Sequence, residues 1–397
     1  MITPILSFLT SVFVVSIALH HAHRLWALPL ISIPAWISLT TAHELHDLAE
    51  LWAMGLVVYF MHNTSVLYFE QWVLPRPSRT KRYDFTAAYK IWSNPQLLGT
   101  AQKVPGAPPR RATDDAPPET RLRFAIIRIL RAAAYLGVLS LSTTHLFPGA
   151  FLPFTKADFA PVKQVYFRRL LGLHHDPHNP HDPSRVITVR ETALRIGTAT
   201  HWILASYLTL NASRDTLAVF FTCILQLDEP SDWPAHLFGN PQGAFTLRRF
   251  WGRFWHRLVY RSYGHWGRFV AQQLLGSRRR QPGSAEKWCI ALVVFCLSGV
   301  LHAVVTKWAL RLEVDLGPMG DVGWYWMNFA AGALERTVFG LVRGLWGPQL
   351  DRWEARVPGL QRVWQGLGFV WVLAFFCWSV PKKEYARGYA MLEEMES

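Results

Sequence analysis

Residues 288–305, WCIALVVFCLSGVLHAVV, form an apolar run in which His302 is the one basic or acidic side chain. With its flanks, this run is long enough for a helix that crosses a lipid bilayer. Gly299 and Ser298 precede His302 by three and four residues on such a helix, so we expect the imidazole to lie over a notch. An ionisable group at membrane depth marks a candidate functional residue, and a hydrogen bond to a neighbouring helix is the plainer alternative.

Further apolar runs extend on both sides of this one. They cover residues 2–19, 26–42, 48–69, 122–142, 196–227, 323–342 and 366–380. Residues 196–227 form either one long span or two short ones broken at 211–215, and the run at 323–342 is interrupted by Glu335 and Arg336. Arg128 and Arg131 lie near the start of their span, where they could snorkel to the membrane surface. The sequence therefore predicts an all-α, polytopic integral membrane helical bundle with about eight transmembrane helices.

Composition agrees with a membrane protein. The 397 residues are 51% hydrophobic and include 19 Trp and 24 Phe, which is too much apolar material for an ordinary soluble fold. The formal net charge of +14 could indicate nucleic acid, but the arginines alternate with tryptophans and lie between apolar runs. A membrane surface with its lipids explains them better, and no nucleic acid partner is expected. The four cysteines lie in apolar runs without CxxC spacing, so no metal site is expected from them.

A second distinctive stretch, residues 246–257, reads TLRRFWGRFWHR. Placed on one helix at about 100° per residue, it forms an aromatic arc that contains Trp251 and Trp255. The same placement puts four arginines on one stripe: Arg249, Arg253, Arg257 and Arg261. Such a helix could simply lie in the membrane interface. That alternative leaves His256 unexplained, since it lies beside the arginine stripe behind Gly252, where a small ligand could approach the backbone.

The pairing of LRRFWGRFWH with a downstream SGVLHAVV resembles the wax synthase branch of the membrane-bound O-acyltransferase (MBOAT) family. It is most similar to fungal members that acetylate terpenoid and meroterpenoid alcohols. The resemblance implies an MBOAT-type bundle of the endoplasmic reticulum. It also implies acetyl-CoA as co-substrate, no permanently bound cofactor, and a lipophilic polycyclic alcohol as acceptor, in secondary metabolite biosynthesis. Glu335 matches an acid that the family places at the end of a helix.

Acyl transfer needs a base for the hydroxyl proton and donors for the oxyanion. We expect His302 to be the general base and His256 to position the thioester or stabilise the oxyanion. Arg249 and Arg253 are candidates for the phosphates of CoA, with Trp251 and Trp255 beside them. Esterification of long-chain alcohols, as in a wax synthase, is the alternative function. A multi-pass transporter is less favoured, because no inverted repeat is visible.

These patterns divide the chain into four segments. We expect N-terminal transmembrane helices at 1–73, a polar cytosolic loop at 74–121, a catalytic membrane domain at 122–380 and a charged tail at 381–397. The second half of the polar loop should be mobile. The tract with His174, His175, His178 and His181 is expected to be a solvated loop, although a His-rich tract can also bind metal.

Overall fold

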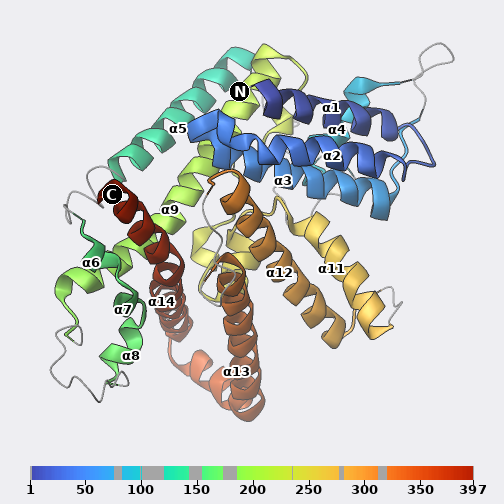
Figure 1. Cartoon of the computed structure of the whole chain (residues 1–397). Coiled ribbons are helices and arrows are strands. Elements are labelled where there is room, and N and C mark those ends of the chain that lie inside the picture. Colours follow the sequence, from blue (N-terminus) through green and yellow to red (C-terminus); the bar gives the residue numbers. More distant parts are fainter. Residues whose placement is uncertain are drawn as a thin grey trace. The chain divides into compact units, whose positions relative to one another are not determined.

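The structure, a computed structural model, describes residues 2–75, 83–98, 100, 120–142, 154–172, 186–234, 236–276, 281–311 and 320–396. Throughout these ranges the regular elements are helices and no strand is present, which confirms the all-α prediction (Figure 1). The chain forms two compact units. The first contains residues 1–110 and 257–330, and the second contains residues 111–256 and 331–397.

The first unit is built on the N-terminal helices. Helix α1 (Ile2–Ala18) packs on α2 (Ala27–Thr40), and α3 (Ala49–Ser65) continues into a π-helical turn, Val66–Glu70. Helices α11 (Tyr260–Leu275) and α12 (Ser284–Trp308) pack on each other and on α3. Their shared core includes Val15, Leu19, Ile31, Leu67 and Val305, all with at most 1% of their surface exposed. The apolar runs thus bury one face within this unit.

The segment 74–121 contains more structure than the predicted polar loop. Helix α4 (Phe85–Trp92) lies in it and begins where the carboxylate of Asp84 accepts a hydrogen bond from the backbone of Ala87 at 2.9 Å. Tyr89 and Ile91 of α4 are buried. The helix forms because apolar residues recur within this short stretch and an aspartate caps its start. Residues 101–119, predicted as a mobile loop, lie outside the described residues.

The second unit is organised around α9 (Val189–Val219), which packs against α5 (Arg121–Leu141) and α14 (Leu360–Glu396). Threonines cap the first turns of α5 and α9, where the hydroxyl groups of Thr120 and Thr188 accept backbone hydrogen bonds. Three short helices, α6 (Lys156–Phe159), α7 (Pro161–Gln164) and α8 (Tyr166–Leu170), belong to the same unit, and α6 and α7 contact α14.

Helix α9 decides between the two alternatives for residues 196–227. It is continuous through 211–215, so the predicted break is absent, and it ends in a π-helical turn, Phe220–Ile224. Two of the polar residues in this stretch have partners that a continuous helix allows. The amide of Asn211 donates to the carbonyl of Tyr207 at 2.8 Å, and Asp215 is paired with arginines. One long helix is therefore correct.

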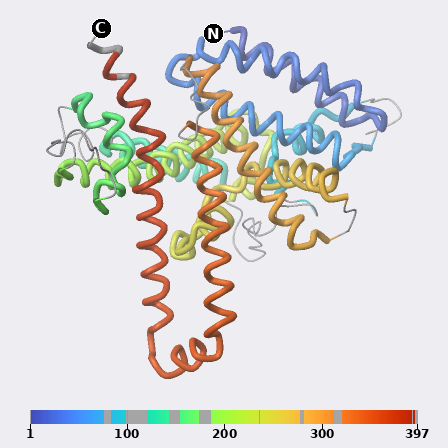
Figure 2. The backbone as a smooth tube through the Cα atoms, turned by 60° about the horizontal axis from the view of Figure 1, so that its bottom comes forward, coloured from blue at the N-terminus to red at the C-terminus, as the bar shows by residue number. Residues whose placement is uncertain are grey.

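Two long helices close the chain. Helix α13 (Asp321–Arg356) runs through Glu335 and Arg336, so this pair interrupts the apolar run and does not break the helix; the boundary between the units falls within α13 after Ala330. Figure 2 shows that the second half of α13 and α14 run antiparallel. Helix α14 passes Pro381 and continues to Glu396, so the charged tail is helical, with Lys382 and Lys383 buried.

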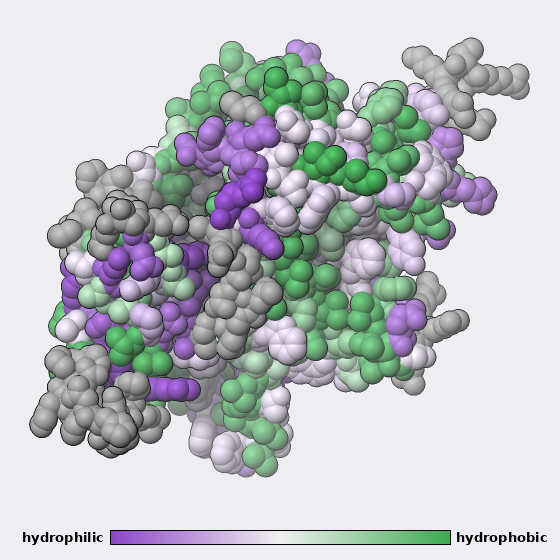
Figure 3. Space-filling view, viewed as in Figure 1, coloured by the Kyte–Doolittle hydropathy of each residue, from purple (hydrophilic) through white to green (hydrophobic). Residues whose placement is uncertain are grey.

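Three helices are long and apolar enough to cross a membrane: Arg121–Leu141, Ser284–Trp308 and Leu360–Ala390. Ile2–Ala18 and Ala27–Thr40 are shorter apolar helices. Large hydrophobic side chains are exposed along several of them, for instance Leu6 and Phe13 on α1 and Leu130 on α5, and Figure 3 shows hydrophobic residues covering broad areas of the face it presents. These helices identify a membrane protein. The count of about eight transmembrane helices stays a prediction.

Candidate functional site

Residues 246–256 of the distinctive stretch lie in the second unit and begin with a short helix. In α10 (Leu247–Arg249) the hydroxyl of Thr246 accepts a hydrogen bond from the backbone of Arg249 at 3.1 Å. A π-helical turn, Phe250–Phe254, follows directly. It closes with the N–H of Trp255 donating to the carbonyl of Phe250 at 2.7 Å, five residues earlier. Such single π turns are rare and occur frequently at functional sites.

The predicted single helix through Arg257 is therefore wrong. Trp255 has extended backbone angles, φ −61° and ψ 153°, and helical structure resumes only with α11 at Tyr260. Because the wide π turn shifts every later side chain and the chain then leaves the helix, Arg257 and Arg261 do not continue the stripe of Arg249 and Arg253. We call residues 246–256 the motif segment.

Glu335 of α13 holds the start of the motif segment. One of its carboxylate oxygens, Oε2, accepts hydrogen bonds from the backbone N–H of Leu247 at 2.8 Å and from the indole N–H of Trp371 at 3.1 Å. The Glu335 side chain is buried. The backbone N–H groups in the first turn of a helix lack partners within it, and a carboxylate there is favoured. The acid that the family resemblance placed at a helix end thus lies in mid-helix, where it caps α10.

Two glycines allow the backbone to approach the motif segment closely. The N–H of Gly239 donates to the carbonyl of Phe254 at 2.8 Å, and a Cβ at position 239 would lie 2.0 Å from the carbonyl oxygen of Arg253. A Cβ at Gly368 of α14 would lie 2.2 Å from the carbonyl oxygen of Phe245. Both contacts exclude any side chain. Gly252, by contrast, has open space where a Cβ would stand.

The tryptophans of the motif segment turn into an aromatic cluster. The ring of Trp255 stacks on Trp202 of α9, with 5.4 Å between centroids and 5° between planes. Trp251 contacts the Trp255 ring at 5.4 Å. Phe250 lies 5.2 Å from Trp255 and 4.7 Å from Phe376 of α14. The structure therefore gathers Trp251 and Trp255 in one place, against residues from two other helices.

His256 follows this cluster directly. Its ring centroid lies 5.7 Å from Trp255 and 5.9 Å from Phe238, and the Phe238 ring meets it edge-on. Its Nδ1 atom is buried and has no hydrogen-bond partner within the described ranges. Burial lowers the pKa of His256 to about 4. At neutral pH the imidazole is therefore uncharged, and one ring nitrogen remains available to a bound molecule.

Arg249 and Arg253 form the basic side of the motif segment. The Arg249 side chain donates from Nε to the carbonyl of Gly243 at 3.1 Å and lies 4.2 Å above the ring of Phe245. Arg253 is exposed. Burial, then the charges of Arg253 and Arg248, lower the pKa of Arg249. No carboxylate of the described residues pairs with Arg249 or Arg253, so their positive field is open to an anion.

His302 belongs to the first unit. It lies on α12 and stacks against Tyr325 of α13, with 5.1 Å between ring centroids and 27° between planes. The expected notch at Gly299 is filled, because a Cβ there would lie 2.8 Å from the Cα atom of Val322. Gly299 thus brings two backbones together, and His302 faces an aromatic ring from the neighbouring helix.

Several neighbours of these residues were not predicted from the sequence. Trp202 lies in a helix with little periodicity, and nothing in the sequence links it to Trp255. Gly239 had a visible signal, because a glycine close before the motif can indicate a close approach of two backbones. Tyr325 had no signal. The His174–His181 tract lies outside the described residues, and within the described ranges no three His, Cys, Asp or Glu side chains gather as a metal site.

Residues 233–318 match the sequence model of the membrane bound O-acyl transferase family. The chain is 30% identical over 185 residues to the acetyltransferase ple2 of Rhodocybe pseudopiperita, covering 45% of this chain and 44% of that protein. It is 26% identical over 189 residues to the acetyltransferase TRI7 of Fusarium sporotrichioides, covering 45% and 39%. It is 27% identical over 154 residues to the O-Mevalon transferase macI of Penicillium terrestre, covering 38% and 33%.

The chain therefore spans less than half the length of these relatives. The segment that matches the family contains the motif segment, His256 and His302. The resemblance to the acyltransferase family that these residues indicated in the sequence is confirmed.

Proposed function

We propose that this chain is an acyl-CoA-dependent O-acetyltransferase, which transfers acetyl from acetyl-CoA to a hydroxyl of a terpenoid or meroterpenoid intermediate in secondary metabolite biosynthesis. The observation that carries the proposal is His256. It is an uncharged imidazole with a buried, unpartnered Nδ1 atom, and it ends a segment that Glu335 and Gly239 hold in place. Relatives named acetyltransferases support the reaction class.

The reaction proceeds by direct attack of the alcohol on the thioester. The hydroxyl oxygen forms a bond to the acetyl carbonyl carbon, and His302 accepts the hydroxyl proton. The carbon–sulfur bond then breaks, and the proton goes to the departing CoA thiolate. His302 suits this role because its ring lies on an apolar helix and stacks against Tyr325. His256 positions the thioester or stabilises the oxyanion.

The basic side of the motif segment binds the donor. Guanidinium groups bind phosphate oxygens in a bidentate fork, and Arg249 and Arg253 have no carboxylate competitor in the described part of the chain. Trp251 and Trp255 are the aromatic residues that we assign to the donor site beside them, Trp251 partly exposed and Trp255 buried in the aromatic cluster. The donor is acetyl-CoA as co-substrate, with no permanently bound cofactor.

The aromatic cluster favours a short acyl group. Each CH₂ of a fatty chain needs apolar surface worth about 0.8 kcal/mol to hold it. The rings of Trp251, Trp255 and Trp202 pack on one another instead of lining an open tunnel. This packing favours acetyl over a fatty acyl group, and wax ester synthesis from a fatty acyl-CoA is the alternative function. The relative named O-Mevalon transferase suggests that the acyl group varies among similar proteins, so the donor needs its own test.

The acceptor is a rigid, lipophilic polycyclic alcohol that reaches the enzyme from the membrane. The exposed apolar faces of α5 and α14 support a multi-pass membrane protein, and we place it in the endoplasmic reticulum, where lipophilic intermediates partition into the bilayer. The experiment is expression in yeast, followed by microsomes supplied with radiolabelled acetyl-CoA and a panel of polycyclic and long-chain alcohols. Labelled esters that disappear in His302→Ala support the proposal, and labelled ester formation no greater than in microsomes without the protein contradicts it.

A further inference from the structure

A buried carboxylate in the second unit is surrounded by three arginines. Asp215 of α9 has none of its surface exposed. Its carboxylate lies 2.5 Å from Nη1 of Arg128, 3.3 Å from Nε of Arg131 and 3.8 Å from Nη1 of Arg214. Three guanidinium groups thus share one carboxylate, which leaves an excess of positive charge. The sequence indicated that Arg128 could snorkel to the membrane surface. In the structure Arg128 is instead buried in this group.

Two of the three arginines have structural partners. Arg128 also donates to the carbonyl oxygens of Trp233 at 2.5 Å and Pro234 at 3.3 Å, so it joins α5, α9 and the loop before the motif segment. Arg131 donates to the hydroxyl of Tyr135 at 3.3 Å. Arg214 differs. Its side chain is 9% exposed, and its Nη1 and Nη2 atoms have no hydrogen-bond partner among the described residues.

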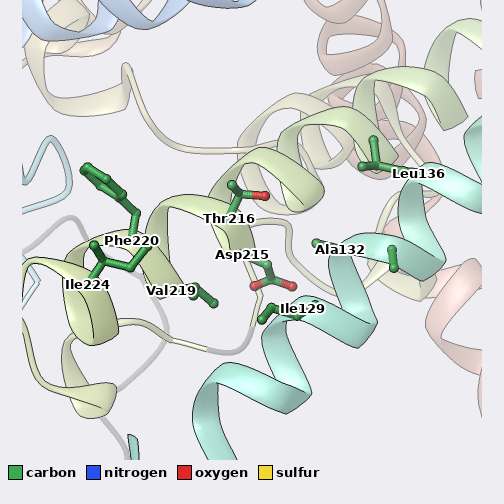
Figure 4. Close-up of a pocket in the computed structure, with 9 residues that line it drawn as sticks. Ile129, Ala132, Leu136, Asp215, Thr216, Val219, Phe220 and Ile224 are labelled. Atoms are coloured by element: carbon green, nitrogen blue, oxygen red, sulfur yellow. The ribbon is translucent and has the colours of Figure 1, made fainter. Parts of the chain in front are cut away.

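An unsatisfied guanidinium in such a place is unfavourable, because a buried charge needs both a counter-charge and hydrogen-bond acceptors. The Asp215 carboxylate cannot supply them alone, since Arg128 and Arg131 already pair with it. Figure 4 shows Asp215 between α9 and α5 beside a pocket of about 350 Å³, whose other labelled residues, such as Ile129 and Phe220, are almost all apolar. Arg214 is not among the residues that line this pocket, so an anion that binds its guanidinium approaches from another side.

The loop before the motif segment provides that side. His236 is exposed, and its pKa is lowered by burial and then by the charges of Arg131, Arg214 and Arg128, which outweigh the opposing effect of Asp215. The field of the three arginines therefore reaches the surface at His236. Two residues further on, the ring of Phe238 meets the ring of His256. An anion at Arg214 would accordingly lie beside the loop that leads to the motif segment.

We infer that Arg214, with Arg131 beside it, binds a phosphoryl group of the CoA donor on the side of α9 that faces the Trp233–Phe238 loop. The inference rests on the proposed function and adds a second phosphate position to Arg249 and Arg253. A phosphate brings negative charge and several acceptor oxygens, which match the two unpartnered nitrogens of Arg214. Partly exposed Arg131 and buried Arg214 carry the positive charge, and His236 lies exposed on the same side.

The test compares two donors that differ in phosphate content. Acetyl-CoA carries the phosphates, and S-acetylpantetheine carries the same thioester without them. Arg214→Gln should raise the KM for acetyl-CoA roughly tenfold to a hundredfold, as expected for losing hydrogen bonds to a charged group, and leave the KM for S-acetylpantetheine unchanged. Arg214→Lys keeps the positive charge but not the bidentate guanidinium, so its KM for acetyl-CoA should lie between those of the wild type and Arg214→Gln. The control is Arg121→Gln, because Arg121 pairs with Glu229 at an exposed position of the same unit.

Binding measurements separate this inference from the proposed function. CoA without an acyl group should raise the unfolding temperature of purified wild-type protein, and the rise should be smaller in Arg214→Lys, which preserves the buried charge and therefore folding. Equal losses with both donors would show a structural role and overturn the inference. The inference would also be overturned if phosphatidic acid vesicles raised the unfolding temperature through Arg214 and CoA did not. If the wild type is active and both Arg214 variants bind CoA as the wild type does, only this inference is refuted. If CoA binds through Arg214 but no acetyl group is transferred, only the proposed function is refuted.

Discussion

The carboxylate of Glu335 accepts a hydrogen bond from the backbone N–H of Leu247, with 2.8 Å between Oε2 and N. The two residues are far apart in the chain, on α13 and at the start of α10. The same oxygen also accepts from the indole of Trp371 on α14. One buried carboxylate thus joins the beginning of the motif segment to α13 and α14.

The first prediction concerns this carboxylate. Glu335→Ala should destabilise the protein by about 1.5–3 kcal/mol, because a hydrogen bond to a charged group is lost and a buried N–H is left without a partner. Acetyl transfer should fall with it. Glu335→Gln keeps one acceptor oxygen and should lose less stability and less acetyl transfer activity than Glu335→Ala. Thermal unfolding in detergent measures the effect, and Arg336→Gln, at the exposed neighbouring position, is the control. Equal stability of Glu335→Ala and Arg336→Gln would contradict a stabilising role for the hydrogen bonds of Glu335.

A second prediction contrasts two glycines. Gly239→Ala should disturb the motif segment and lower both expression and activity, because the added Cβ would lie 2.0 Å from the carbonyl oxygen of Arg253. Gly252→Ala should leave stability unaffected, since its Cβ meets open space. Detergent-extracted yield and unfolding temperature decide between them. Equal yields and equal unfolding temperatures of the two variants would contradict the close contact between Gly239 and Arg253.

Much of the fold could be predicted from hydrophobic runs alone. Residues 122–142 and 288–305 were predicted as spans and correspond closely to α5 and α12. Breaks were harder to predict, because a polar residue whose side chain finds a partner in the fold need not end a helix. Asn211 and Glu335 have partners within the fold, so α9 and α13 continue past them. Tertiary contacts that the sequence does not show decide such cases.

The candidate site was predictable only as a set of residues. The sequence identified Trp251, Trp255 and His256 by their motif, and the structure gathers them in one unit. It could not show the π turn at Phe250–Phe254, because periodicity assumes a regular helix. Trp202 and Gly239 contact the motif segment only in the folded chain, and no local sequence pattern predicts which residues they contact.

A third prediction follows from the pKa of His256, which burial lowers to about 4. Between the ordinary histidine value of about 6.5 and this lower value, the unfolded chain binds a proton that the folded chain excludes. Stability should therefore fall as the pH falls through this range. His256→Gln should reduce the slope of unfolding temperature against pH. Part of the slope should remain, because burial and the charges of Arg261 and Arg268 also lower the pKa of His265 to about 4. A slope that is the same in wild type and His256→Gln contradicts this prediction.

The fourth prediction addresses the proposed base. His302→Ala should lower kcat by about 10² to 10⁴-fold, the usual range for a general base, while the protein accumulates in membranes as the wild type does. Tyr325→Phe keeps the ring that stacks on His302 and should retain activity. Immunoblots of membranes normalise the rates. Near wild-type turnover in His302→Ala would exclude His302 as the base.

The most direct measurement of the central claim is donor competition with purified protein in detergent. Acetyl-CoA and palmitoyl-CoA are offered together with a rigid polycyclic alcohol and hexadecanol, and the four possible esters are quantified by mass spectrometry. The acetate of the polycyclic alcohol should dominate, and His302→Ala should form none of the esters. Preferred use of palmitoyl-CoA, or faster esterification of hexadecanol than of the polycyclic alcohol, would contradict this expectation.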